Sequence, residues 1–135
     1  KIWKIWTVHP EKKELTELMK LGSNLMNDEK LAKAKKIFSE IIRRDPAWAE
    51  AWNKRATVLY LQKKYANSQK DINKVISLES RHFGALSGQG LVQIELQNYE
   101  LALKSYKEVL KIYPTNVSAK IMIEQLNELI KNKTI

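Results

Sequence analysis

Cysteine is absent from this chain of 135 residues, and glycine, proline and histidine occur only four, three and two times. Without thiolates the chain forms no disulfide, no cysteine zinc site and no iron–sulfur cluster. No stretch approaches the roughly 18 apolar residues of a membrane-spanning helix, so we do not expect the chain to cross a bilayer. The remaining composition, 44% hydrophobic and 29% charged residues, is typical of one folded domain of ordinary size.

Arginine is also scarce, although the net charge is +9. Of the 24 basic residues, 20 are lysine and four are arginine, whereas base and phosphate recognition enriches the forked guanidinium group. We therefore do not expect nucleic acid as the partner. A weaker alternative stays open, in which lysines on an outer face attract RNA or an acidic surface through charge alone. These lysines are Lys33, Lys35, Lys36, Lys63, Lys64, Lys70 and Lys74.

A repeat of 34 residues organises the sequence. Six columns of residues keep their size and polarity at this spacing. The columns are Gly22 with Ala56 and Gly90, Leu18 with Trp52 and Leu86, Ala34 with Ser68 and Ala102, Phe38 with Ile72 and Tyr106, Ile41 with Val75 and Val109, and Pro46 with Ser80 and Pro114. Local helix periodicity alone would not produce such a long-range match.

Each repeat is predicted to form two helices. In residues 49–61, apolar side chains recur every three or four positions, and a second such stripe follows a turn near residues 63 and 64. The small column at Gly22 is expected to let the two helices approach closely, facing the small column at Ala34. Pro46 and Pro114 are expected to end second helices, because proline disfavours helix at the preceding residue.

These residues resemble the tetratricopeptide repeat. The matching positions are Leu21, Gly22, Ala34, Phe38 and Pro46 in the first unit, Trp52, Ala56 and Tyr65 in the second, and Gly90, Tyr99, Ala102, Tyr106 and Pro114 in the third. The resemblance implies an all-α fold, a right-handed superhelical solenoid of helix-turn-helix repeats with a cap at each end. We expect one domain over residues 1–135, divided into an N-terminal capping segment (1–14), repeats at 15–48, 49–82 and 83–116, and a C-terminal capping helix (117–135).

The N-terminal "KIWKIW" places Ile2, Trp3, Ile5 and Trp6 in one apolar cluster. Two interpretations stay open: the end of a helix that packs on the first repeat, or an exposed arm that dimerises, so that the chain is a monomer or a weak dimer. The segment also resembles that of short bacterial repeat proteins with Ile-Trp-x-x-Trp before the repeats, some of which carry export signals. The first residue is Lys1 rather than Met, which leaves the compartment unknown: the bacterial cytoplasm, or the periplasm if an export signal preceded it.

The C-terminal segment is expected to form a helix that covers the last repeat. Asn116 or Ser118 would begin it. The apolar residues expected to face inward are Ile121, Ile123, Leu126, Leu129 and Ile130.

No pattern indicates catalysis, a metal site or a cofactor. His9 and His82 have no metal-binding partner three or four residues further along, and no serine or carboxylate pair stands in a catalytic context. Arg55 occupies a place where an aliphatic residue is usual, and so it needs a partner if it is buried. Asp71 or Glu79 would supply an ion pair; alternatively, Arg55, Arg81 and His82 would form an anion-binding corner.

The resemblance implies that the first helix of each unit lines an inner groove that binds a protein or peptide. The groove positions of the family correspond to Thr16, Met19, Ser23, Met26 and Asn27, to Glu50, Asn53, Thr57, Tyr60 and Leu61, and to Gly84, Ser87, Leu91, Ile94 and Glu95. Co-chaperone members grip a carboxylate terminus with Lys, Asn and Arg at five places, which here hold Met19, Ser23, Lys54, Gly84 and Gly88. We therefore expect a non-catalytic interaction module that does not bind chaperone tails.

Overall fold

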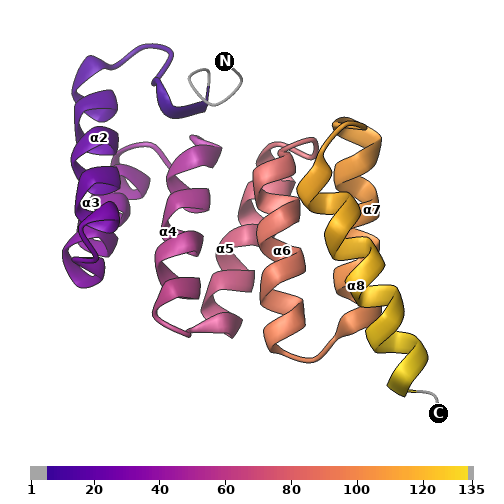
Figure 1. The fold of residues 1–135 in the computed structure, drawn as a ribbon. Coiled ribbons are helices and arrows are strands. Elements are labelled where there is room, and N and C mark those ends of the chain that lie inside the picture. Colours follow the sequence, from indigo (N-terminus) through magenta and orange to yellow (C-terminus); the bar gives the residue numbers. More distant parts are fainter. Residues whose placement is uncertain (1–5, 134–135) are drawn as a thin grey trace. The chain divides into compact units, whose positions relative to one another are not determined.

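In a computed structural model, the described residues 6–133 are helical and contain no strand (Figure 1). The helices are α2 (Lys13–Asn27), α3 (Leu31–Arg44), α4 (Ala49–Leu61), α5 (Tyr65–Leu78), α6 (Phe83–Glu95), α7 (Tyr99–Ile112) and α8 (Val117–Lys133). The predicted all-α class and the division of each repeat into two helices are confirmed. Of the predicted apolar cluster "KIWKIW", only Trp6 lies within the described residues.

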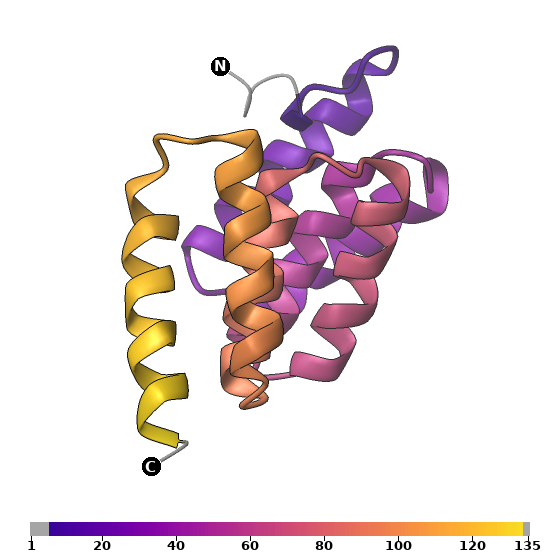
Figure 2. The same ribbon diagram turned by 90° about the vertical axis from the view of Figure 1, so that its right-hand side faces the viewer.

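The chain forms two compact units, residues 1–79 and residues 80–135. In the first unit α3 packs against both α2 and α4, and α4 pairs with α5. In the second unit α7 packs against α6 on one side and α8 on the other (Figure 2). The expected single domain with its repeat boundaries stays a prediction.

The turns between paired helices repeat at the spacing of the sequence. Glu29, Lys63 and Gln97, which are 34 residues apart, are the described non-glycine residues with positive φ, at 61°, 62° and 64°. In each turn, the next residue donates its backbone N–H to the carbonyl five residues earlier, as Lys30 does to Leu25 at 2.8 Å. This left-handed residue and its bond pattern reverse the chain after the first helix without using glycine.

The core of each repeat depends on a missing side chain. A Cβ atom added to Gly22 would lie 2.5 Å from the Phe38 ring, and one added to Gly90 would lie 2.4 Å from the Tyr106 ring. Both rings are buried. The glycine column therefore contacts the aromatic column, a relation that was not predicted from the sequence.

The second repeat solves the same packing problem with a different pair. Ala56 stands at the glycine position and Ile72 at the aromatic position. The Ser68 hydroxyl donates to the Ala56 carbonyl at 2.7 Å, so the small columns also lie close together here. Where the first helix carries the methyl group of Ala56, the second helix thus carries Ile72, which is smaller than the aromatic residues of the other two repeats.

The second helices of the first and third repeats end just before the prolines, as predicted. Helix α3 ends at Arg44, two residues before Pro46, and α7 ends at Ile112, two residues before Pro114. Helix α5 ends at Leu78, at the equivalent place, although Ser80 replaces the proline. Proline is thus sufficient but not necessary for this boundary.

The C-terminal helix begins at a predicted residue, but it buries a different face from the one expected. The Asn116 side chain accepts the Ala119 N–H at 2.9 Å and caps α8. Ala119 and Leu126 are buried, whereas Ile121 and Leu129 are 47% and 43% exposed. The inward prediction was therefore wrong for Ile121 and Leu129, because the apolar residues of α8 surround the helix and the buried side follows Ala119 and Leu126 instead.

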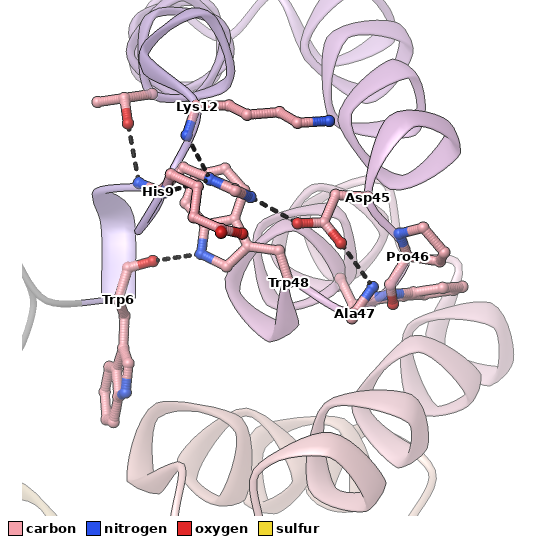
Figure 3. A network of polar contacts seen from close by, with 10 residues as sticks. Trp6, His9, Lys12, Asp45, Pro46, Ala47 and Trp48 are labelled. Atoms are coloured by element: carbon pink, nitrogen blue, oxygen red, sulfur yellow. Dashed lines mark hydrogen bonds and ion pairs between the residues drawn. The ribbon is translucent and has the colours of Figure 1, made fainter.

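His9 attaches the N-terminal segment to the first repeat (Figure 3). Its Nδ1 accepts the backbone N–H groups of Glu11 and Lys12 at 3.0 and 2.9 Å, so the ring proton resides on Nε2 and is donated to Asp45 at 2.5 Å. The ring also meets Trp48 edge-on, with 5.0 Å between centroids. No sequence pattern indicates this contact, because Asp45 lies 36 residues away.

Two further bonds complete this attachment. The Trp48 indole donates to the Trp6 carbonyl at 2.9 Å, and the Thr16 hydroxyl accepts the backbone N–H of His9 at 2.8 Å. The hydrogen bond from His9 is the largest influence on Asp45 and lowers the pKa of its carboxyl, and a bond from the Ala47 N–H acts in the same direction against partial burial. Asp45 therefore stabilises the fold as a carboxylate.

We predict that substitutions at Gly22 and Phe38 have strongly coupled effects on the free energy of unfolding. Gly22→Ala alone should destabilise the chain by about 1–2 kcal/mol, because the overpacking cost exceeds the helix-propensity gain. Phe38→Ile alone should also destabilise it, by leaving a cavity. The double variant reproduces the Ala56 and Ile72 pair, and its cost in urea denaturation should fall below the sum of the single costs by about 1 kcal/mol. Additive costs would contradict the packing relation.

We also predict a stability contribution from Asp45 that depends on pH. The pKa of this carboxyl is lower in the folded chain, so its contribution is complete above the unfolded value of about 4 and is lost as pH falls through the folded value. Asp45→Asn should cost about 1 kcal/mol at pH 7, and the gap to the wild type should narrow in acid. Urea denaturation at pH 7 and near pH 3 measures it. Asp28→Asn, at an exposed and unbonded carboxylate, is the control, and a gap that does not change with pH would contradict the assignment.

Candidate partner-binding surface

Helix α4 presents a stripe of mixed chemistry on its accessible side. Its buried side carries Ala51, Ala56, Val58 and Leu59. The accessible stripe consists of Asn53, Thr57, Tyr60 and Leu61, which recur every three or four residues. Leu61 is 49% exposed, so the stripe offers both apolar area and polar groups.

The polar groups of this stripe are held in place by the helix itself. The Asn53 side-chain amide donates to the carboxylate of Glu50 at 3.0 Å, and the Thr57 hydroxyl donates to the Asn53 carbonyl at 3.1 Å. Glu50 is 3% exposed and lies in the first turn of α4, where the helix dipole favours a negative charge. The amide oxygen of Asn53 accepts no hydrogen bond from residues 6–133, and a ligand N–H group could use it.

The groove residues predicted on α2 divide into three kinds. Met19 is 1% exposed and belongs to the hydrophobic core, so its assignment to the groove was wrong. Ser23 and Met26 are half-buried, and Asn27 is exposed. Thr16, whose hydroxyl bonds to His9, serves the N-terminal attachment. The family pattern placed Met19 correctly on the first helix but did not reveal which way its side chain turns.

In the compact unit of residues 80–135, the predicted groove residues lie on α6, the first helix of the third repeat. Leu91 is 39% exposed, while Ser87 and Ile94 are half-buried. Val92 and Leu86, on the other side of this helix, are buried. The pattern of an accessible and a buried side on α6 thus repeats that of α4.

Arg55 forms the predicted ion pair with Asp71. Its Nε and Nη2 atoms donate to the two Asp71 oxygens at 2.7 and 2.9 Å, and its Nη1 donates to the Ser39 hydroxyl at 3.2 Å. The Arg55 guanidinium also lies 5.2 Å from the centre of the Trp52 ring. Asp71 is 5% exposed, so this bidentate pair satisfies a carboxylate that would be costly to bury alone.

The anion-binding corner stays a prediction, and two of its three members have other bonds. The Arg55 guanidinium is engaged by Asp71, and the His82 ring is fully buried with its Nδ1 accepting the Ala85 N–H at 3.0 Å. That bond makes His82 the N-terminal cap of α6. Arg81 is exposed.

The described part of the chain offers neither a metal-binding cluster nor a membrane-spanning helix. Within residues 6–133, no group of three or more His, Cys, Asp and Glu side chains could hold a metal ion. No helix in the same range is long and apolar enough to span a bilayer.

Comparison with known families and proteins identifies the repeat. The tetratricopeptide repeat matches residues 19–68 and again residues 83–116. A TPR repeat-containing protein of Rhizobium etli is 35% identical over 118 residues, which are 87% of this chain and 58% of that protein. The chain thus spans little more than half the length of this relative.

Solved structures show the same fold. The first TPR of Spaghetti (RPAP3), bound to the HSP90 peptide SRMEEVD, superposes with a TM-score of 0.85 at 23% identity, covering 92% of this chain and 98% of that one. The first TPR domain of human RPAP3 also gives 0.85, at 24% identity, with 89% and 94% covered. With the 34-residue columns and the paired helices, these matches show that the chain belongs to the tetratricopeptide repeat family.

Proposed function

We propose that this chain is a non-catalytic interaction module whose first helices bind a segment of a partner protein. The observation that carries the proposal is the accessible stripe of α4, in which Leu61 is 49% exposed beside the anchored Asn53 and Thr57. Apolar area supplies binding energy, and fixed polar groups select the backbone of a ligand. The structure of a family member with a bound HSP90 peptide supports a peptide as the kind of ligand.

The ligand of this chain differs from an acidic chaperone tail. The family's carboxylate clamp needs Lys, Asn and Arg side chains at places that here hold Met19, Ser23, Gly84 and Gly88. Met19 is in the core, and serine and glycine bring no charge. The second-repeat place holds Lys54, and one cation does not replace the fork of Lys, Asn and Arg. The proposed ligand is therefore a mixed apolar and polar segment, recognised by Leu61, Tyr60 and the Asn53 amide.

We predict that Leu61→Asp abolishes capture of the partner while the fold is retained. A charge at a half-exposed position leaves the core intact, but it places a desolvated carboxylate in the interface. The matched control is Leu101→Asp on α7, where a leucine of similar exposure, 43%, lies on a second helix. Cross-linked co-purification from the native cells identifies proteins retained by the wild type and the control.

The affinity of any such protein is then titrated with purified variants. Leu61→Asp should weaken binding at least about tenfold, and Asn53→Ala with Tyr60→Ala should also weaken it. Circular dichroism checks that each variant is folded. Equal affinity of the wild type and the Leu61→Asp variant would remove the α4 stripe from the proposed interface.

A further inference from the structure

A basic channel lies on the first unit, and none of the residues of the α4 stripe lines it. It consists of two neighbouring depressions: one of about 510 Å³ between α3 and the turn that precedes α5, and one of about 280 Å³ between α3, α4 and α5. Lys35 lines both depressions, so they are adjacent, and together they are called the basic channel. Lys36, Gln62 and Lys64 line the larger one, and Lys70 lines the smaller.

The carboxylates of this channel already form ion pairs with arginine side chains. Glu40 pairs with Arg43 and Arg44 at 2.5 and 2.7 Å, and hydrogen bonds from these guanidiniums, first Arg43 and then Arg44, lower its pKa to about 2. Asp71 accepts hydrogen bonds from the Nε and Nη2 atoms of Arg55. Glu40 therefore remains ionised near neutral pH, and both carboxylates are matched by arginine.

The lysines of the channel, in contrast, have no counter-charge. The side-chain ammonium groups of Lys35, Lys36, Lys64 and Lys70 form no ion pair or hydrogen bond with any residue in the range 6–133. Their ammonium groups surround a hollow rather than a flat face, where several cations act on one ligand. This arrangement calls for a ligand with several negative charges along its length.

We propose that the basic channel binds an extended, acidic peptide segment of a partner protein. Side chains on one face of an extended peptide are about 7 Å apart. Lys64, the N-cap residue of α5, and Lys70 are about 9 Å apart along the helix axis, a difference that flexible lysine side chains span. The backbone of such a peptide also brings N–H donors. The Oε1 atom of Gln62 is buried without a hydrogen-bond partner, and a rotation of its side chain would offer it to such a donor.

The same observations disfavour a nucleic acid in this channel. No aromatic side chain lines either depression, so there is no platform for stacking bases. The arginines, which would bind phosphate with two parallel bonds, are engaged by Glu40 and Asp71. Free ammonium groups act as point charges and suit single carboxylates.

The test uses the full chain and labelled probes in fluorescence anisotropy. The principal probe is a short peptide in which glutamate and alanine alternate; the control probes are the same peptide with glutamine for glutamate, and a single-stranded oligouridine. The channel variant is Lys36→Gln with Lys64→Gln. The matched control is Lys104→Gln with Lys107→Gln, at two exposed lysines of α7, which lowers the net charge equally.

The channel variant should bind the glutamate peptide about fivefold more weakly than the wild type, while the control changes affinity less than about twofold. Lys36→Arg with Lys64→Arg should retain binding, and added salt should weaken it. Equal losses in both glutamine variants would reduce the effect to net charge and overturn the proposal, as would failure of the wild type to bind the glutamate peptide. Tighter binding of the oligouridine, with the same loss in the channel variant, would replace the peptide by a nucleic acid. None of these outcomes involves Leu61, so the α4 stripe is tested separately.

Discussion

The close approach of the two helices in each repeat is the constraint on which the rest of this structure depends. In the first and third repeats an aromatic ring lies where a glycine has no side chain, with less than 3 Å between the ring and the position of a Cβ atom. Such contact leaves no room for adjustment in a close-packed interior. The spacing of the helices, and with it the register of every side chain along them, follows from this one contact.

The 34-residue columns predicted the helices, their pairing and the ends of α3 and α7, because those features repeat and each copy supports the others. Features that occur once were harder to predict. The bond between His9 and Asp45 joins residues 36 positions apart with no second copy, and the rotation of α8 is decided by one unrepeated face. Met19 shows a third limit, since a position that lines a groove in relatives lies in the core here.

In the first unit, arginine and lysine side chains differ in their polar contacts. The guanidiniums of Arg43, Arg44 and Arg55 bind carboxylates on the same or a neighbouring helix, because a planar fork matches a carboxylate with two bonds. Arg55 also reaches Ser39 on α3, and so it joins the first repeat to the second. These three arginines thus contribute to the fold, and the unpaired positive charge that lines the basic channel belongs to lysine.

This separation fits the two recognition surfaces that we propose. The proposed stripe on the first helices is apolar and weakly polar, so binding there would depend on contact area and change little with salt. The basic channel between α3 and α5 depends on charge, which acts over about 8–10 Å at physiological ionic strength and speeds encounter more than it strengthens the final complex. A partner with an acidic segment next to an apolar one would use both: the lysines would raise its rate of association, and the α4 stripe would set how long it stays.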